Sequence, residues 1–107
     1  MMEIDCHTVK AKLDTGDDLL LLDCREQEEV QTVTIDGSVW IPMSEIEQRR
    51  AELEPHRQRE IVVYCHLGGR SLQVAQWLCQ QGFDNVQSMA GGIERWAEAV
   101  DPSLARY

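Results

Sequence analysis

The sequence predicts a single α/β domain built on a mostly parallel sheet of about five strands. Residues 19–22 and 61–64 are apolar or aromatic at every position instead of alternating. Such runs are typical of parallel strands covered by helices on both faces. Predicted helices lie between the strands, which favours parallel pairing. The 107 residues fit one domain, 1–107, that buries about two-thirds of its unfolded surface.

The remaining elements follow in chain order. Residues 2–4 are expected to form a short edge strand, and weaker strand candidates lie at 39–41 and 86–89. Helices are expected at 8–13, 27–33, 45–53, 71–81 and 93–100.

Two of these helices have terminal signals. Ser44 and Glu47 have the spacing of a capping box, which predicts a helix ending near Leu53. Gly82 followed by Phe83 predicts a glycine C-cap with its hydrophobic contact.

The charge balance limits the classes of partner. Ten Lys and Arg residues against 19 Asp and Glu residues give a net charge of −9. Nucleic acids and anionic membranes reward basic residues, so neither is expected as a partner. The first residues lack the features of a secretory signal, and the longest aliphatic run is far below the ~20 residues of a spanning helix. We therefore expect a cytoplasmic monomer.

The four cysteines, at positions 6, 24, 65 and 79, include no Cys-x2-Cys pair. This spacing argues against a zinc ribbon and against a thioredoxin-type redox pair. In a cytoplasmic protein we expect the cysteines to be reduced and most of them to be small core side chains. No metal and no cofactor are expected.

Cys65 is the exception, because it ends a buried strand and is followed by Gly68, Gly69, Arg70 and a helix start. A tight loop at a helix N-terminus can turn its amides towards an anion, and glycine permits the positive φ values that such a loop needs. These conditions, with a neighbouring arginine, lower a thiol pKa from about 8.5 into the range of roughly 3.5–7.5. A lone cysteine at a strand end is more often inert, but these neighbours favour a nucleophile.

Other polar residues have structural interpretations. Asp23 and Arg25 are expected to form a buried ion pair that braces the loops. Cys24 has no glycine loop after it and is interpreted as structural, with the alternative that it lies close enough to resolve an oxidised Cys65. His66 is next to Cys65 in sequence, which does not by itself place a base within reach of the thiol.

Four segments taken together resemble the single-domain rhodaneses, a family of sulfurtransferases. Asp-Cys-Arg-Glu at 23–26 resembles the family's Asp-x-Arg-Glu, and 36–42 resembles its Pro-Gly-Ala-x-x-Ile-Pro. Residues 65–70 resemble the six-residue active-site loop, and 91–96 resemble Gly-Gly-x-x-x-Trp. The sequence departs from the family at 34–37, where Thr-Ile-Asp-Gly replaces His-Ile-Pro-Gly.

The resemblance implies a three-layer rhodanese-like fold and a sulfane sulfur carried as a persulfide on Cys65, with Arg70 adding charge. It also implies that the persulfide is held by the loop backbone, which comprises His66, Leu67, Gly68, Gly69, Arg70 and Ser71. The expected donor is a small anion such as thiosulfate, and the expected acceptor is cyanide or a thiol. A protein donor or acceptor is a further option.

Three alternatives remain at this point. The first is a persulfide carrier that relays sulfur to cofactor-assembly or tRNA-modifying enzymes, since its half-reaction on Cys65 is the same. The second is a cysteine-based phosphatase or arsenate reductase, but cell-cycle phosphatases of similar fold use Cys-x5-Arg, whereas four residues separate Cys65 from Arg70. The third is a non-catalytic interaction module, against which the retained cysteine argues.

Overall fold

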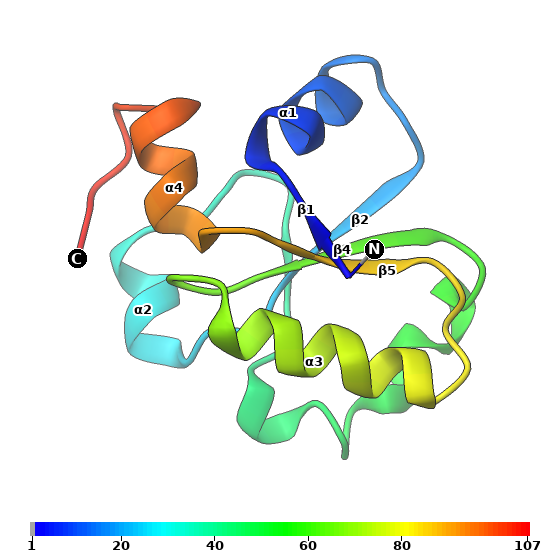
Figure 1. The fold of residues 1–107 in the computed structure, drawn as a ribbon. Helices are drawn as coiled ribbons and strands as arrows, with labels where there is room; N and C mark the ends of the chain where they lie inside the picture. The colour runs from blue at the N-terminus through cyan, green and yellow to red at the C-terminus, as the bar shows by residue number, and fades with distance from the viewer. Residues whose placement is uncertain (1) are drawn as a thin grey trace.

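The computed structural model describes residues 2–107 (Figure 1). Five strands form one sheet in the order β1-β5-β4-β2-β3, and every pair of neighbours is parallel. The predicted fold class and the edge position of the first strand are confirmed. The strands are β1 (Glu3–Ile4), β2 (Leu19–Asp23), β3 (Val39–Trp40), β4 (Glu60–Tyr64) and β5 (Val86–Met89).

Helices cover both faces of the sheet, as Figure 1 shows. One face packs against α3 (Gly69–Gln80) and two short 3-10 helices, η1 (Met43–Glu45) and η2 (Arg50–His56). The other face packs against α1 (Cys6–Asp14) and α4 (Gly92–Ala99). A short helix, α2 (Gln27–Thr32), follows β2.

The central strands explain the unbroken apolar runs in the sequence. Alternate side chains of a strand point to opposite faces. Leu20 and Leu22 of β2 enter the core under α3, whereas Leu19 and Leu21 enter the core under α1 and α4. Because both faces are covered, every position of β2 is buried, and an alternating pattern is absent.

The helix predicted over 45–53 is wrong. Two 3-10 helices and a turn occupy this segment, and the Ser44 hydroxyl does not cap Glu47; it donates to Glu26 on the loop after β2 (2.8 Å). Pro55 lies inside η2, where it has no N–H to donate. Distant partners for Ser44 and burial of Leu53 against the sheet outweigh the local capping signal.

The other helix boundaries lie within a few residues of the predictions. Helix α3 begins at Gly69, two residues before the predicted start at Ser71. Its predicted glycine C-cap is confirmed, because Gly82 has φ +93°, the Phe83 N–H donates to Leu78 O (3.1 Å), and the Phe83 side chain is buried. Among residues 2–107, no helix has the length and apolar character needed to cross a membrane.

Candidate active site

Cys65 lies directly after β4, and its sulfur sits beneath the turn that leads into α3. The N–H groups of Gly68 and Ser71 donate to Sγ at 3.1 and 3.3 Å. Gly68 is the N-cap of α3 and has φ +111°, a conformation that favours glycine. The sulfur therefore receives two amide donors at the positive end of a twelve-residue helix. Both features stabilise negative charge on sulfur.

Two serines join this turn to the neighbouring strand. The Ser71 hydroxyl donates to Gly68 O (3.2 Å) and lies 2.7 Å from the hydroxyl of Ser88 on β5. The Cys65 thiol in turn donates to Ser71 Oγ (3.4 Å). Ser71 and Ser88 are fully buried, so these bonds fix the turn against the sheet. Sequence patterns did not indicate the contact of Ser88 with Ser71, because the two residues are 17 positions apart.

A second helix N-terminus holds the other side of the loop. The N–H groups of Ile93 and Glu94, in the first turn of α4, donate to Cys65 O (2.9 Å) and His66 O (3.1 Å). These carbonyls therefore point away from the sulfur and leave its surroundings to the amides. The close approach requires glycine at position 92, which has φ +61°. A Cβ there would lie 2.3 Å from His66 O and 2.5 Å from Cys65 O.

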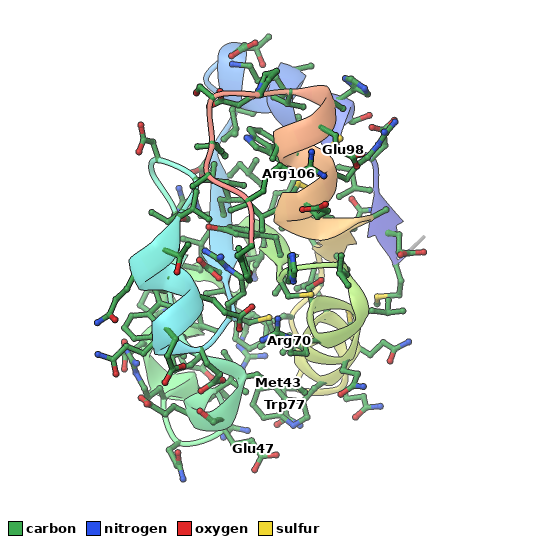
Figure 2. The ribbon with its side chains drawn as sticks, turned by 90° about the vertical axis from the view of Figure 1, so that its left-hand side faces the viewer. Met43, Glu47, Arg70, Trp77, Glu98 and Arg106 are labelled. Carbon is green, nitrogen blue, oxygen red and sulfur yellow. The ribbon has the colours of Figure 1, made fainter. Side chains whose placement is uncertain are left out.

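Arg70 forms a two-point ion pair with the carboxylate of Glu29. Its Nη1 and Nη2 donate to the two oxygens of Glu29 on α2, at 2.6 and 2.8 Å. Figure 2 shows Arg70 at the start of α3, on the side towards α2. The hydrogen bonds from Arg70 lower the pKa of Glu29 to about 2, and the carboxylate raises the pKa of the guanidinium. Arg70 was expected to add charge at the loop, and in the structure its guanidinium also links α3 to α2 through two hydrogen bonds to Glu29.

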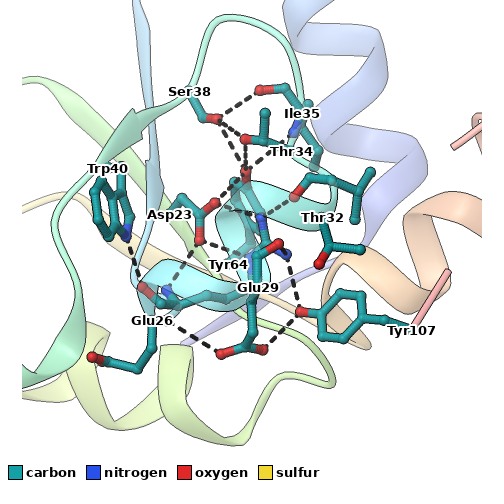
Figure 3. Close-up of polar contacts among 12 residues, drawn as sticks. Asp23, Glu26, Glu29, Thr32, Thr34, Ile35, Ser38, Trp40, Tyr64 and Tyr107 are labelled. Carbon is teal, nitrogen blue, oxygen red and sulfur yellow. Dashed lines mark hydrogen bonds and ion pairs between the residues drawn. The ribbon is translucent and has the colours of Figure 1, made fainter. Parts of the chain in front are cut away.

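A buried ion pair between Asp23 and Arg25 braces the loop that follows β2, and Figure 3 draws its hydrogen bonds. Arg25 donates to both carboxylate oxygens of Asp23, at 2.9 and 2.7 Å, and also to Val33 O (2.7 Å). The Tyr64 hydroxyl donates to Asp23 as well (2.9 Å). Both charged side chains have no exposed surface, so their charges are balanced by each other and by these hydrogen bonds.

Tyr107 connects this ion pair with Glu29. Its hydroxyl accepts a hydrogen bond from Arg25 (3.0 Å) and donates to Glu29 Oε2 (2.8 Å), as Figure 3 shows. Its ring stacks on His66 with 4.0 Å between centroids. Burial raises the pKa of Tyr107 to about 12, so the hydroxyl remains a donor to Glu29 at neutral pH. His66 is thus turned towards Tyr107, with its Nε2 3.9 Å from a Glu94 carboxylate oxygen.

The structure brings together the residues expected at the loop and adds several that the sequence did not indicate. Two of the six expected backbone donors, Gly68 and Ser71, reach the sulfur directly, and the Leu67 side chain is 65% exposed at the tip. Glu29 and Tyr107 were missed, because their partners lie 41 and 78–82 positions away. Glu29 has one local signal, its place as the third residue of a capping box begun by Glu26.

A cysteine in an amide-lined loop at a helix N-terminus of a parallel α/β domain is an arrangement that suits a cysteine nucleophile. Comparison of the sequence with known protein families identifies the family of this chain. A family model described as the rhodanese-like domain matches residues 5–99. The chain therefore belongs to the rhodanese-like family, and the resemblance noted in its sequence is confirmed.

Several relatives are named as sulfurtransferases. A sulfurtransferase of Allochromatium vinosum is 35% identical over 103 residues, which cover 96% of this chain and 94% of that protein. The structure of human single domain sulfurtransferase TSTD1 matches with a TM-score of 0.83 and 27% identity, covering 92% of this chain and 97% of that one. A thiosulfate sulfurtransferase structure from Pseudomonas aeruginosa matches with a TM-score of 0.81 and 27% identity over 92% of this chain.

Some relatives are much longer than this chain. The chain covers 18% of the Pseudomonas protein and 23–50% of several other curated relatives.

Replacing Gly92 with alanine tests the packing of α4 on the loop. Gly92→Ala should destabilise the fold and impair the chemistry of Cys65, because its Cβ meets two loop carbonyls. The matched control is Gly37→Ala: Gly37 also has positive φ (+85°), but no atom lies within 4 Å of its Cβ position. The φ penalty of about 1–2 kcal/mol is common to both variants. Gly92→Ala should cost about 1–3 kcal/mol more in urea unfolding. Equal losses of unfolding free energy in Gly92→Ala and Gly37→Ala would show that the close contact of Gly92 with the loop carbonyls does not affect stability.

The Glu29–Arg70 pair should contribute to acid sensitivity. The pKa of Glu29 is lowered on folding to about 2, so its stabilising contribution is complete above about pH 4.5 and is lost as pH falls towards 2. Glu29→Gln should lower the free energy of unfolding by about 1–3 kcal/mol at neutral pH. It should also flatten the decline between pH 4.5 and 2. Urea unfolding at several pH values measures both. If the free energy of unfolding falls equally with pH in the wild type and in Glu29→Gln, the lowered pKa of Glu29 does not contribute to acid sensitivity.

Proposed function

We propose that the protein is a sulfurtransferase that moves the sulfane sulfur of a thiosulfate-type donor through a persulfide on Cys65. The observation that supports this most directly is the pair of amides, from Gly68 and Ser71, that donate to Cys65 Sγ at the N-terminus of α3. A thiolate is the reactive form of cysteine, and amide donors with a helix N-terminus favour it.

In the first half-reaction the Cys65 thiolate attacks the outer sulfur of thiosulfate. A new S–S bond forms to Sγ, the S–S bond of thiosulfate breaks, and its electron pair leaves with sulfite. The negative charge moves from Sγ to the departing sulfite, while the persulfide's terminal sulfur takes a place in the loop. Its charge is stabilised by the loop backbone, whose donors are in place before reaction. Loss of one such donor typically costs about 10²–10³ in rate.

Arg70 and Glu29 serve the anionic donor in a defined way. The carboxylate of Glu29 holds both terminal nitrogens of Arg70, so the guanidinium plane has one orientation at the end of the loop. The positive charge of Arg70 is partly balanced by Glu29 but remains available to the incoming thiosulfate dianion. The second half-reaction returns Cys65 to its thiolate: cyanide or an acceptor thiolate attacks the terminal sulfur, and Sγ leaves with its electrons.

Intact-protein mass spectrometry tests the function. Wild-type protein should gain one sulfur atom after incubation with thiosulfate and lose it to cyanide with release of thiocyanate. Cys65→Ser should show neither event. Cys79→Ser is the matched control, because Cys79 is the half-buried cysteine on α3, and it should load as the wild type does. Sulfur that loads equally onto Cys65→Ser would falsify the proposal.

The geometry of Arg70 makes a second prediction. Lysine keeps the charge but cannot make the two parallel hydrogen bonds to Glu29. Arg70→Lys should therefore raise KM for thiosulfate roughly tenfold, the equivalent of about 1.4 kcal/mol, with a smaller effect on kcat. Steady-state kinetics measures the effects on KM and kcat separately. An unchanged KM in both Arg70→Lys and Arg70→Ala would remove Arg70 from the donor site.

One observation favours a second candidate, a persulfide carrier that exchanges sulfur with another protein. Leu67 is a large apolar side chain, 65% exposed, at the tip of the loop that holds Cys65. Such a side chain suits contact with a protein surface better than contact with thiosulfate. If the carrier role applies, Leu67→Ser should slow loading from a cysteine desulfurase and leave loading from thiosulfate unchanged. Equal rates from the desulfurase would favour the small-molecule enzyme.

A further inference from the structure

Cys24 and Cys65 occupy neighbouring positions at the ends of adjacent strands. In the β2–β4 pairing Leu22 is opposite Val63 and Asp23 is opposite Tyr64. The ladder continues past the strands, since the Cys24 N–H donates to Tyr64 O (3.1 Å). The next pair in register is therefore Cys24 and Cys65. Neighbouring strands lie about 4.8 Å apart.

The two cysteine side chains also point to the same side of the sheet. Leu20, Leu22 and Cys24 alternate into the apolar cluster beneath α3, and Cys65 enters that cluster from β4. Disulfides require Cα atoms roughly 4.4–6.8 Å apart and side chains directed towards each other. Strand spacing and shared face meet the first condition and favour the second.

The other two cysteines are placed differently. Cys6 belongs to α1 and is buried in the core on the opposite side of the sheet. Cys79 lies in the last turn of α3, whereas the sulfur of Cys65 lies at the start of that helix. Among the described cysteines, Cys24 is thus the one in register with the reactive thiol.

The surroundings of Cys24 hold its thiol in the protonated form. Burial, followed by the charges of Cys65 and Asp23, raises the pKa of the Cys24 thiol far above its ordinary value. Cys24 is fully buried, and its neutral thiol is a poor nucleophile towards external reagents. Conversion of the Cys65 thiolate to a neutral species removes one of these opposing charges, and the charge of Arg70 then favours ionisation of Cys24.

We propose that Cys24 is a resolving cysteine, which traps hydroperoxide-oxidised Cys65 as a reversible Cys24–Cys65 disulfide. In the first step the Cys65 thiolate attacks a hydroperoxide oxygen, the O–O bond breaks, and Cys65 becomes a sulfenic acid with release of hydroxide or alkoxide. In the second step Cys24 sulfur attacks Cys65 Sγ, the S–O bond breaks, and the Cys24 proton leaves with the hydroxyl group as water. The peroxide supplies the single two-electron oxidation, and the second step is a condensation that releases water and needs no further oxidant.

The disulfide would protect the reactive cysteine. A sulfenic acid that is not trapped is oxidised further to sulfinic and sulfonic acids, which thiols do not reverse. A disulfide is reopened by thiol–disulfide exchange with two equivalents of thiol. This inference needs only an oxidisable thiol at Cys65 and is independent of the proposed sulfur donor.

The test is to treat the reduced 107-residue protein with one equivalent of hydrogen peroxide, alkylate it under denaturing conditions and map the peptides. The mass of the wild type should fall by two hydrogen atoms, and two of its thiols should no longer be alkylated. Peptide mapping should find a Cys24–Cys65 linked peptide that dithiothreitol separates. Cys79→Ser is the matched control and should form the same link. Cys24→Ser and Cys24→Ala, treated with excess hydrogen peroxide, should instead gain two or three oxygen atoms on Cys65 that dithiothreitol does not remove.

The wild-type protein alone can overturn the inference, so the outcome does not depend on the folding of the Cys24 variants. Oxygen addition to Cys65 without the linked peptide, or a link from Cys65 to Cys6 or Cys79, would contradict it. Thiosulfate loading is measured separately on the reduced protein. Normal loading with no disulfide refutes the resolving role alone, whereas a disulfide without loading refutes only the proposed sulfur transfer.

Discussion

The structure depends on one constraint: the buried sulfur of Cys65 must be held inside the protein by backbone amides. Cys65 is almost fully buried, at 1% exposure, and its sulfur is bonded by the amides of Gly68 and Ser71. A buried anion without donors would be strongly destabilised. The N-termini of α3 and α4 meet the constraint together, since α3 supplies donors to the sulfur and α4 binds the carbonyl groups of Cys65 and His66.

The rest of the molecule fixes these two helix ends in place. The parallel sheet brings the carboxyl ends of β2 and β4 side by side, so the loops that follow them can share contacts. The buried pair of Asp23 and Arg25 ties the first loop together, and Glu29 joins it to Arg70 in the second. The two ion pairs therefore join the loops beside the thiol, and removal of one partner would leave the other without its counter-charge.

The sequence was sufficient for the sheet, the central helices and the position of Cys65, because these rest on local patterns. The apolar runs of β2 and β4 and the two glycines before Arg70 carry that information within a few residues. It was not sufficient for the segment after Ser44, whose capping signal was outweighed by a distant carboxylate, Glu26. Contacts across long separations are invisible to such patterns: the pairing of Glu29 with Arg70 and of Tyr107 with Arg25 arises only from the folded chain.

The central claim is that the loop backbone holds a sulfur atom delivered to Cys65. A crystal structure of the protein after treatment with thiosulfate tests it most directly. We predict electron density for one additional sulfur bonded to Cys65 Sγ, with loop amides within hydrogen-bonding distance of that atom. Thiosulfate bound intact at Arg70, or an added sulfur directed away from the amides, would contradict the account.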